Sequence, residues 1–152
     1  MFDLGTSFLA SVARDPQALA IVDGPLRLTY AAWYRRISAL VAGLDRLGLS
    51  PGDHVVTVLQ NRWEAATLHW ACQFAGLIVT PVNWRAKPDE VDFYLQDAAA
   101  PAIFYEEVSA AAVRAAAEAP SRHRIAVGVA ACGDIAVESL LAGDCAEAQP
   151  RA

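Results

Sequence analysis

The most constraining feature of this 152-residue chain is the alternation of short β-branched runs with longer amphipathic segments. The run HVVTVL, from His54 to Leu59, is apolar at almost every position, as a strand covered on both faces of a parallel sheet requires. Further strands are predicted at 77–82, 101–107 and 125–130. Since helical segments separate these runs, we predict an α/β fold with a mostly parallel sheet flanked by helices and joined by right-handed crossovers.

The strongest helical pattern covers Tyr30 to Leu47, where apolar residues recur at spacings of three, four and seven. Thr29 is placed to cap the first turn, and Gly48 can adopt the left-handed conformation that ends a helix. This segment is therefore predicted to bury one face.

Weaker signals predict the other helices. Asn61 followed by Glu64 resembles a capping pair that opens a second helix running through Phe74, whose tryptophans we interpret as core residues. Pro88, followed by two acidic residues, opens a third helix that ends near Asp97. The ranges 108–119 and 135–141 are predicted as a weak helix and as a last turn or short helix.

The N-terminal segment precedes the alternating pattern. Met1 to Asp15 is predicted as a short helix that ends before Pro16. Asp23 and Gly24 lie between two short apolar runs and predict a hairpin.

Charge and composition exclude several classes of function. The net charge of −5, with scattered arginines and a single lysine, provides no basic patch for a nucleic-acid partner. Three cysteines, at 72, 132 and 145, are an odd number without metal-ligand spacing, so we expect free thiols and a cytoplasmic location. The longest apolar run, 76–82, is far below the ~20 residues that a membrane helix needs, so no membrane span is expected.

The chemistry of such a sheet is expected beyond the carboxyl ends of its strands. The sequence contains neither a Gly-x-Gly-x-x-Gly fingerprint nor a Gly-x-x-x-x-Gly-Lys-Ser/Thr loop, the two standard cradles for phosphate. The segment after Val82 is the best candidate, because Asn83, Arg85 and Lys87 place an amide and two cations at a strand end. The alternative is a turn in which Asn83 bonds its own backbone and the cations are merely exposed.

Three segments together carry a family resemblance: LTYAAW, GLSPGDHVVTVLQN and FAGLIVTPVNWRAKPDEVDFYL. In this order and spacing they resemble the N-terminal region of the adenylate-forming superfamily, which includes acyl- and aryl-CoA synthetases. The resemblance covers Phe8 to Leu141 and departs from the family at Ala32, where a glutamate commonly completes the helix cap. It implies that residues 1–141 are the N-terminal portion of the family's large domain. Residues 142–152 carry no periodic pattern and are predicted to form a linker-like tail.

The resemblance also implies an activity. Family members use ATP and Mg²⁺ to convert a carboxylic acid substrate to an acyl-adenylate, and then transfer the acyl group to a thiol, commonly coenzyme A. The family's phosphate loop and adenylation motifs lie downstream of the matched region, so we expect this chain alone to be inactive and to bind none of these cofactors tightly. Arg85 is the one residue that the resemblance nominates, as a contact to a phosphate of coenzyme A.

Two interpretations follow. The chain is either the N-terminal portion of an acyl-CoA synthetase, whose partner is the remainder of the enzyme, or a non-catalytic binding or oligomerisation module derived from that fold, whose partner is a second copy or another protein. A small dinucleotide-dependent enzyme is disfavoured, because the glycine fingerprint is missing.

Overall fold

A computed structural model describes residues 4–143 and 145–151, and within them the chain forms one five-stranded sheet and one separate hairpin. The elements in chain order are α1 (Leu4–Arg14), β1 (Leu19–Asp23), β2 (Leu26–Thr29), α2 (Tyr30–Arg46), β3 (His54–Val58), α3 (Trp63–Ala75), β4 (Ile78–Pro81), α4 (Pro88–Asp97), β5 (Ala102–Glu106), α5 (Glu107–Ala115), the 3₁₀ turn η1 (Ala119–Ser121), β6 (His123–Val127), β7 (Ile135–Ala136) and α6 (Val137–Leu141). The large sheet has the order β4-β3-β5-β6-β7, and all of its pairings are parallel. The predicted α/β fold is confirmed.

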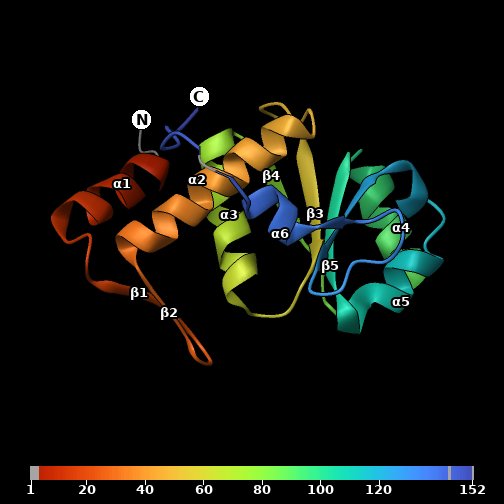
Figure 1. Ribbon diagram of the computed structural model, residues 1–152. Coiled ribbons are helices and arrows are strands. Elements are labelled where there is room, and N and C mark those ends of the chain that lie inside the picture. The colour runs from red at the N-terminus through yellow and green to blue at the C-terminus, as the bar shows by residue number, and fades with distance from the viewer. Residues whose placement is uncertain (1–3, 144, 152) are drawn as a thin grey trace.

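Helices cover both faces of this sheet. Helices α1, α2, α3 and α6 lie on one side, and α4 and α5 lie on the other (Figure 1). Successive residues of β3 alternate between the two cores: Val55 belongs to the first, and Val56 and Val58 to the second. All three are 0% exposed, which explains why this strand is apolar along nearly its whole length.

Aromatic packing holds α1 against α2 and α3, which belong to the first helical layer, the one formed by α1, α2, α3 and α6. The ring of Phe8 lies 4.7 Å from that of Trp70 and 5.3 Å from that of Trp33, measured between centroids. Such tilted and edge-on contacts are favourable beyond the area that they bury. The core role predicted for Trp70 is confirmed; residues 1–3 of the predicted first helix lie outside the described residues.

The predicted ends of α2 are confirmed. The Thr29 hydroxyl accepts the N–H of Ala32 at 3.2 Å, so the cap forms although Ala32 stands where the family commonly has glutamate. Gly48 has φ of +82°, a conformation that other residues adopt only with strain.

The predicted start of α3 is wrong in detail. Asn61 and Glu64 do not form a capping pair, because the helix begins at Trp63 and its N-cap is Arg62. The N–H of Trp63 donates instead to a carboxylate oxygen of Asp23 at 2.9 Å, a contact from the hairpin 40 positions away. A tertiary contact has therefore replaced the local motif.

The C-terminal segments also differ from the predicted ranges. Strand β6 ends at Val127, earlier than expected, because Gly128 with φ of +95° turns the chain out of the sheet. The segment 135–141 contributes the two-residue edge strand β7 before the expected short helix. So short a strand carries no periodic signal in the sequence.

Residues 145–151 of the expected linker-like tail form no helix or strand, yet they pack on the first helical layer. The N–H of Ala148 donates to the hydroxyl of Ser38 at 3.0 Å, and the carbonyl of Ala148 accepts from Tyr34. Arg151 forms a double hydrogen bond with Asp45 at 2.6 and 2.7 Å. These contacts attach the tail to α2.

Candidate functional site

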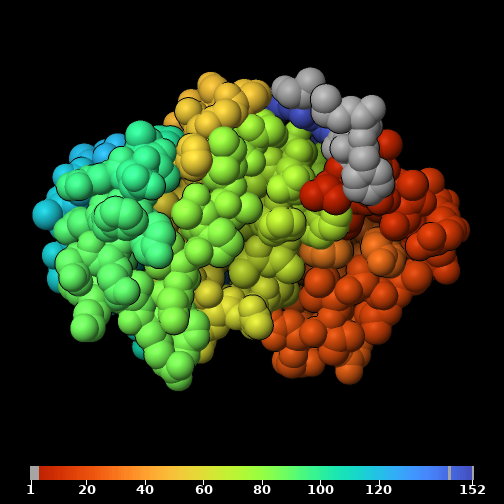
Figure 2. Space-filling view, turned by 180° about the vertical axis from the view of Figure 1, so that it is seen from behind, coloured from red at the N-terminus to blue at the C-terminus, as the bar shows by residue number. Residues whose placement is uncertain are grey.

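The carboxyl ends of the parallel strands meet at one rim of the sheet. The molecule is hollowed along this rim, between the β1-β2 hairpin and the segment that follows β4 (Figure 2). Ligands of open α/β sheets bind beyond the carboxyl ends of the strands, so this rim is the candidate site.

The turn after β4 is held in one conformation by backbone contacts. Val82 donates to the carbonyl of Thr57 at 2.8 Å, which anchors the start of the turn to β3. The side-chain oxygen of Asn83 accepts the N–H of Arg85 at 2.9 Å, and its carbonyl accepts the N–H of Ala86 at 2.8 Å. Asn83 thus bonds its own turn, as the alternative interpretation expects.

The two cations of this turn are exposed. The guanidinium carbon of Arg85 lies 4.0 Å from the centre of the Trp84 ring, and neither Arg85 nor Lys87 forms an ion pair within the described part of the chain. The N–H of Lys87 donates to a carboxylate oxygen of Glu90 at 2.8 Å, at the start of α4. The charged groups that the sequence singled out are therefore present at the rim with free donors.

Next to this turn lies an ion-pair network that the sequence did not predict. The guanidinium of Arg62 donates two hydrogen bonds to Glu64, at 2.7 and 2.9 Å, and one to Glu106 at 2.9 Å. The second oxygen of Glu106 accepts the N–H of Gln60. Hydrogen bonding to Glu64 is the main cause that raises the pKa of Arg62, and both carboxylates are nearly buried. The network ties the loop after β3 to the end of β5.

A hollow of about 430 Å³ opens beside this network. Thr57, Gln60 and Asn61 from the end of β3 and its loop line it, as do His69 of α3 and Pro81 of β4. Arg62 borders the hollow, but its Nε and both terminal nitrogens already donate to carboxylates. With two carboxylates to one guanidinium, this part of the rim offers no free cation to an anionic ligand.

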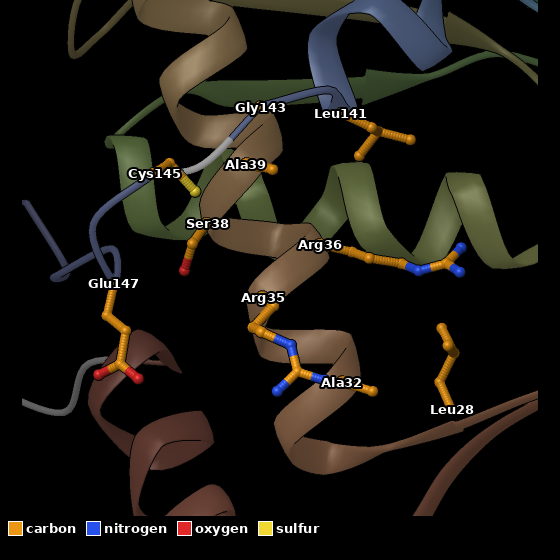
Figure 3. A pocket seen from close by; sticks show the side chains of 10 residues that line it. All are labelled: Leu28, Ala32, Arg35, Arg36, Ser38, Ala39, Leu141, Gly143, Cys145 and Glu147. Atoms are coloured by element: carbon orange, nitrogen blue, oxygen red, sulfur yellow. The ribbon is translucent and has the colours of Figure 1, made fainter.

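A second hollow, of about 340 Å³, lies outside the rim (Figure 3). Arg35 and Arg36 reach into it from α2, and Cys145 and Glu147 approach from the tail. Arg36 also lies over the ring of Trp63, at 4.6 Å. These side chains come from the packing of α2 against the tail, not from strand ends.

Tyr105 of β5 and Arg124 of β6 both contact the carboxylate of Asp134, which precedes β7. Asp134 accepts the hydroxyl of Tyr105 and pairs with Arg124 at 2.6 Å, and its side chain is 1% exposed. Burial, and then the hydrogen bond to Asp134, raise the pKa of Tyr105. These contacts hold the loop between β6 and β7 in place.

No group of three histidine, cysteine or acidic side chains in 4–143 and 145–151 is placed to hold a metal ion. All three cysteines are free thiols. Cys72 lies in the core, and its burial raises the pKa of its thiol to about 12. As for membranes, each described helix is too short or too polar to cross one.

The fold is that of the N-terminal region of the adenylate-forming superfamily. A family model described as AMP-binding enzyme matches residues 8–150, so the chain belongs to that family. The resemblance inferred from the sequence is confirmed.

Similar proteins include several ligases. Feruloyl-CoA synthase of Amycolatopsis is 32% identical over 114 residues, which cover 75% of this chain and 23% of that protein. A fatty acid–[acyl-carrier-protein] ligase of Streptomyces coeruleorubidus is 29% identical over 81% of this chain and 23% of its own length. The fold also matches a benzoate CoA ligase from Burkholderia xenovorans, with a TM-score of 0.85 at 18% identity, over 97% of this chain and 30% of that one. The chain thus spans about a quarter to a third of these proteins.

Proposed function

We propose that this chain is the N-terminal part of an acyl- or aryl-CoA ligase, an enzyme that activates a carboxylic acid as an acyl-adenylate with ATP and Mg²⁺ and transfers it to coenzyme A. The observation that carries the proposal is the match of residues 8–150 to the AMP-binding family, together with relatives named as CoA and carrier-protein ligases. A cytoplasmic location belongs to the proposal and is supported by the three free thiols.

The residues at the rim fit coenzyme A better than they fit ATP. Arg85 has free guanidinium donors and fits a phosphate of coenzyme A. The neighbouring Arg62 uses three of its five N–H donors on Glu64 and Glu106, and these two carboxylates outweigh its single positive charge, so it does not fit the phosphates of ATP. We therefore assign Arg85 to coenzyme A and assign no residue of this chain to ATP or Mg²⁺.

The proposal includes inactivity of the 152-residue chain by itself. Adenylation depends on preorganised donors and cations that stabilise charge on the transferred group. The sequence lacks a glycine-rich phosphate loop, and no free cation adjoins the larger hollow in the described residues. The remainder of the enzyme would supply these groups.

The test is ATP-pyrophosphate exchange with a panel of aromatic and aliphatic carboxylic acids. We expect no exchange by the purified chain, and acid-dependent exchange by the longest polypeptide that the coding DNA encodes, provided that it includes a Ser/Thr/Gly-rich segment ending in lysine. Exchange by the chain alone would refute its inactivity. A longer polypeptide that contains the loop but activates no acid would refute the ligase assignment.

A binding or self-association module is the second candidate, and the hairpin favours it. Ile21 and Leu28 pack the hairpin against the first core, but Leu19 and Val22 of β1 are 54% and 57% exposed, and a partner would cover them. Light scattering on the isolated chain distinguishes the candidates: a defined dimer supports this second function, and a stable monomer counts against it.

A further inference from the structure

Trp84 and Arg85 form a stacked pair at the carboxyl end of the edge strand β4. The Arg85 guanidinium carbon lies 4.0 Å from the centre of the indole ring, well inside the ~6 Å range of a cation–π contact. Arg85 is exposed, whereas Trp84 is half-buried. The long side chain of Arg85 therefore lies over a ring that is itself partly covered by the protein.

The backbone beneath this pair is fixed by the hydrogen bonds of the turn. Asn83 accepts from both Arg85 and Ala86, and Ala86 is buried at 8% exposure in the second core. A side chain on such a turn loses little further freedom when it binds a ligand, apart from its own rotamers. Stacking on Trp84 restricts those rotamers in advance.

A stacked guanidinium keeps its edge available. The five N–H donors of arginine point outward in the guanidinium plane, so a contact with an indole face leaves all of them free. In the described residues, Arg62, Arg122, Arg124 and Arg151 instead form ion pairs with carboxylates. Arg85 is thus an oriented cation at the rim with unused donors.

Nearby charge does not account for anion binding at this turn. Lys87 adds a positive charge, but Asp89 and Glu90 follow in the first turn of α4 and offset the two cations. Recognition would therefore depend on the position of the donors of Arg85 more than on long-range attraction.

We propose that Trp84 is a positioning residue, which holds Arg85 ready to bind the phosphate monoester of a nucleotide through two parallel hydrogen bonds. The inference rests on the proposed function, in which that nucleotide is the adenosine bisphosphate part of coenzyme A. It adds a residue, Trp84, whose role is to orient the cation without contacting the phosphate itself.

The experiment measures the binding of adenosine 3′,5′-bisphosphate to the 152-residue chain. NMR signals of the backbone amides and arginine side chains report the binding. Without ligand, the Arg85 side-chain protons should show an upfield ring-current shift, which Trp84→Phe retains and Trp84→Leu removes. With ligand, Trp84→Leu should weaken binding about threefold, whereas Trp84→Phe should stay within about twofold of the original chain. Arg85→Gln should weaken it at least about tenfold.

Controls separate this role from general charge and from folding. Arg27→Gln removes another exposed arginine, on β2, and should leave binding unchanged. Adenosine alone and inorganic phosphate should each bind more weakly than the bisphosphate. If Trp84→Leu does not fold, the test is the ring-current shift of the Arg85 side-chain protons in the original chain. Absence of this shift would overturn the stacked geometry.

The remaining outcomes point to different errors. Unchanged affinity in folded Trp84→Leu overturns the positioning role but leaves Arg85 as a contact. Equal binding of inorganic phosphate overturns the nucleotide as occupant. If millimolar bisphosphate perturbs no amide in 83–87, both the inference and the assignment of Arg85 fail, while the ligase proposal is still decided by pyrophosphate exchange.

Discussion

The guanidinium of Arg62 donates to the carboxylate of Glu106 at 2.9 Å and joins two parallel strands at the point where each leaves the sheet. Glu106 is 5% exposed, and its other oxygen accepts the N–H of Gln60. Since burying a carboxylate costs free energy unless it is paired and hydrogen-bonded, both contacts offset the cost of placing Glu106 here. The side chain of Glu106 therefore ties the loop that borders the larger hollow to the end of β5.

Removing that side chain should destabilise the fold. Glu106→Ala leaves a donor of Arg62 and the N–H of Gln60 without acceptors, and we expect a loss of about 2–3 kcal/mol in the free energy of unfolding. Glu106→Gln keeps an oxygen for Gln60 and should lose less, about 1 kcal/mol. Urea denaturation measures both, and the exposed Glu107→Gln is the matched control. Equal stability of the Ala variant and the control would show that the network does not support the loop.

A second prediction concerns the crossing of α2 and α6 at Gly43. A Cβ added there would lie 2.7 Å from the carbonyl oxygen of Leu140 and 2.8 Å from its Cβ, so the two helices could not keep their distance. Gly43→Ala should therefore destabilise the protein by about 1–3 kcal/mol, although alanine is the better helix former. Ala42→Gly in the same helix calibrates the propensity difference, at about 1 kcal/mol. A more stable Gly43→Ala variant would contradict the close packing.

The contacts of the tail give a third prediction. The Tyr34 hydroxyl donates to the carbonyl of Ala148 at 2.5 Å, in a buried position. Tyr34→Phe removes the donor and leaves that carbonyl unpaired, which should cost about 1–2 kcal/mol. Deleting residues 145–151 should cost at least as much, as measured by thermal unfolding. If the deletion leaves the thermal unfolding of the protein unchanged, the contacts between the tail and α2 do not stabilise the fold.

How far the sequence could predict this structure depended on the range of the contacts involved. The ends of α2 are set by Thr29 and Gly48, which act within one turn, and they could be predicted from local pattern. The start of α3 could not, because its capping carboxylate, Asp23, comes from a distant hairpin. A local motif at Asn61 and Glu64 was present, but Arg62 engaged the glutamate instead.

The same limit applied to the rim. The exposed turn at 83–87 could be predicted because its residues are contiguous in the sequence and its geometry is local. The Arg62–Glu106 pair spans 44 positions and forms only because β3 and β5 are neighbours in the sheet. A sequence pattern gives the order of strands along the chain, whereas the adjacency of β5 to β3 is a property of the folded sheet.

The last prediction uses the buried thiol of Cys72. Burial raises its pKa from 9.0 to about 12, because the thiolate would lose its hydration in the apolar core. A raised pKa means that the unfolded chain releases the proton more readily, so the contribution of Cys72 to stability is fully present below pH 9 and is lost between pH 9 and about 12. The loss approaches about 1.4 kcal/mol per pH unit within that window.

Cys72→Ala isolates this contribution from the tyrosines, which ionise in a similar range. The variant should be less stable at pH 7, because it loses buried volume, but its free energy of unfolding should fall less steeply than that of the original chain between pH 9 and 12. Alkylation gives a second measurement: exposed Cys132 and Cys145 should react with iodoacetamide at pH 8, whereas Cys72 should react only after unfolding. Parallel stability curves, together with rapid alkylation of Cys72 in the folded chain, would show that the thiol is not enclosed in the core.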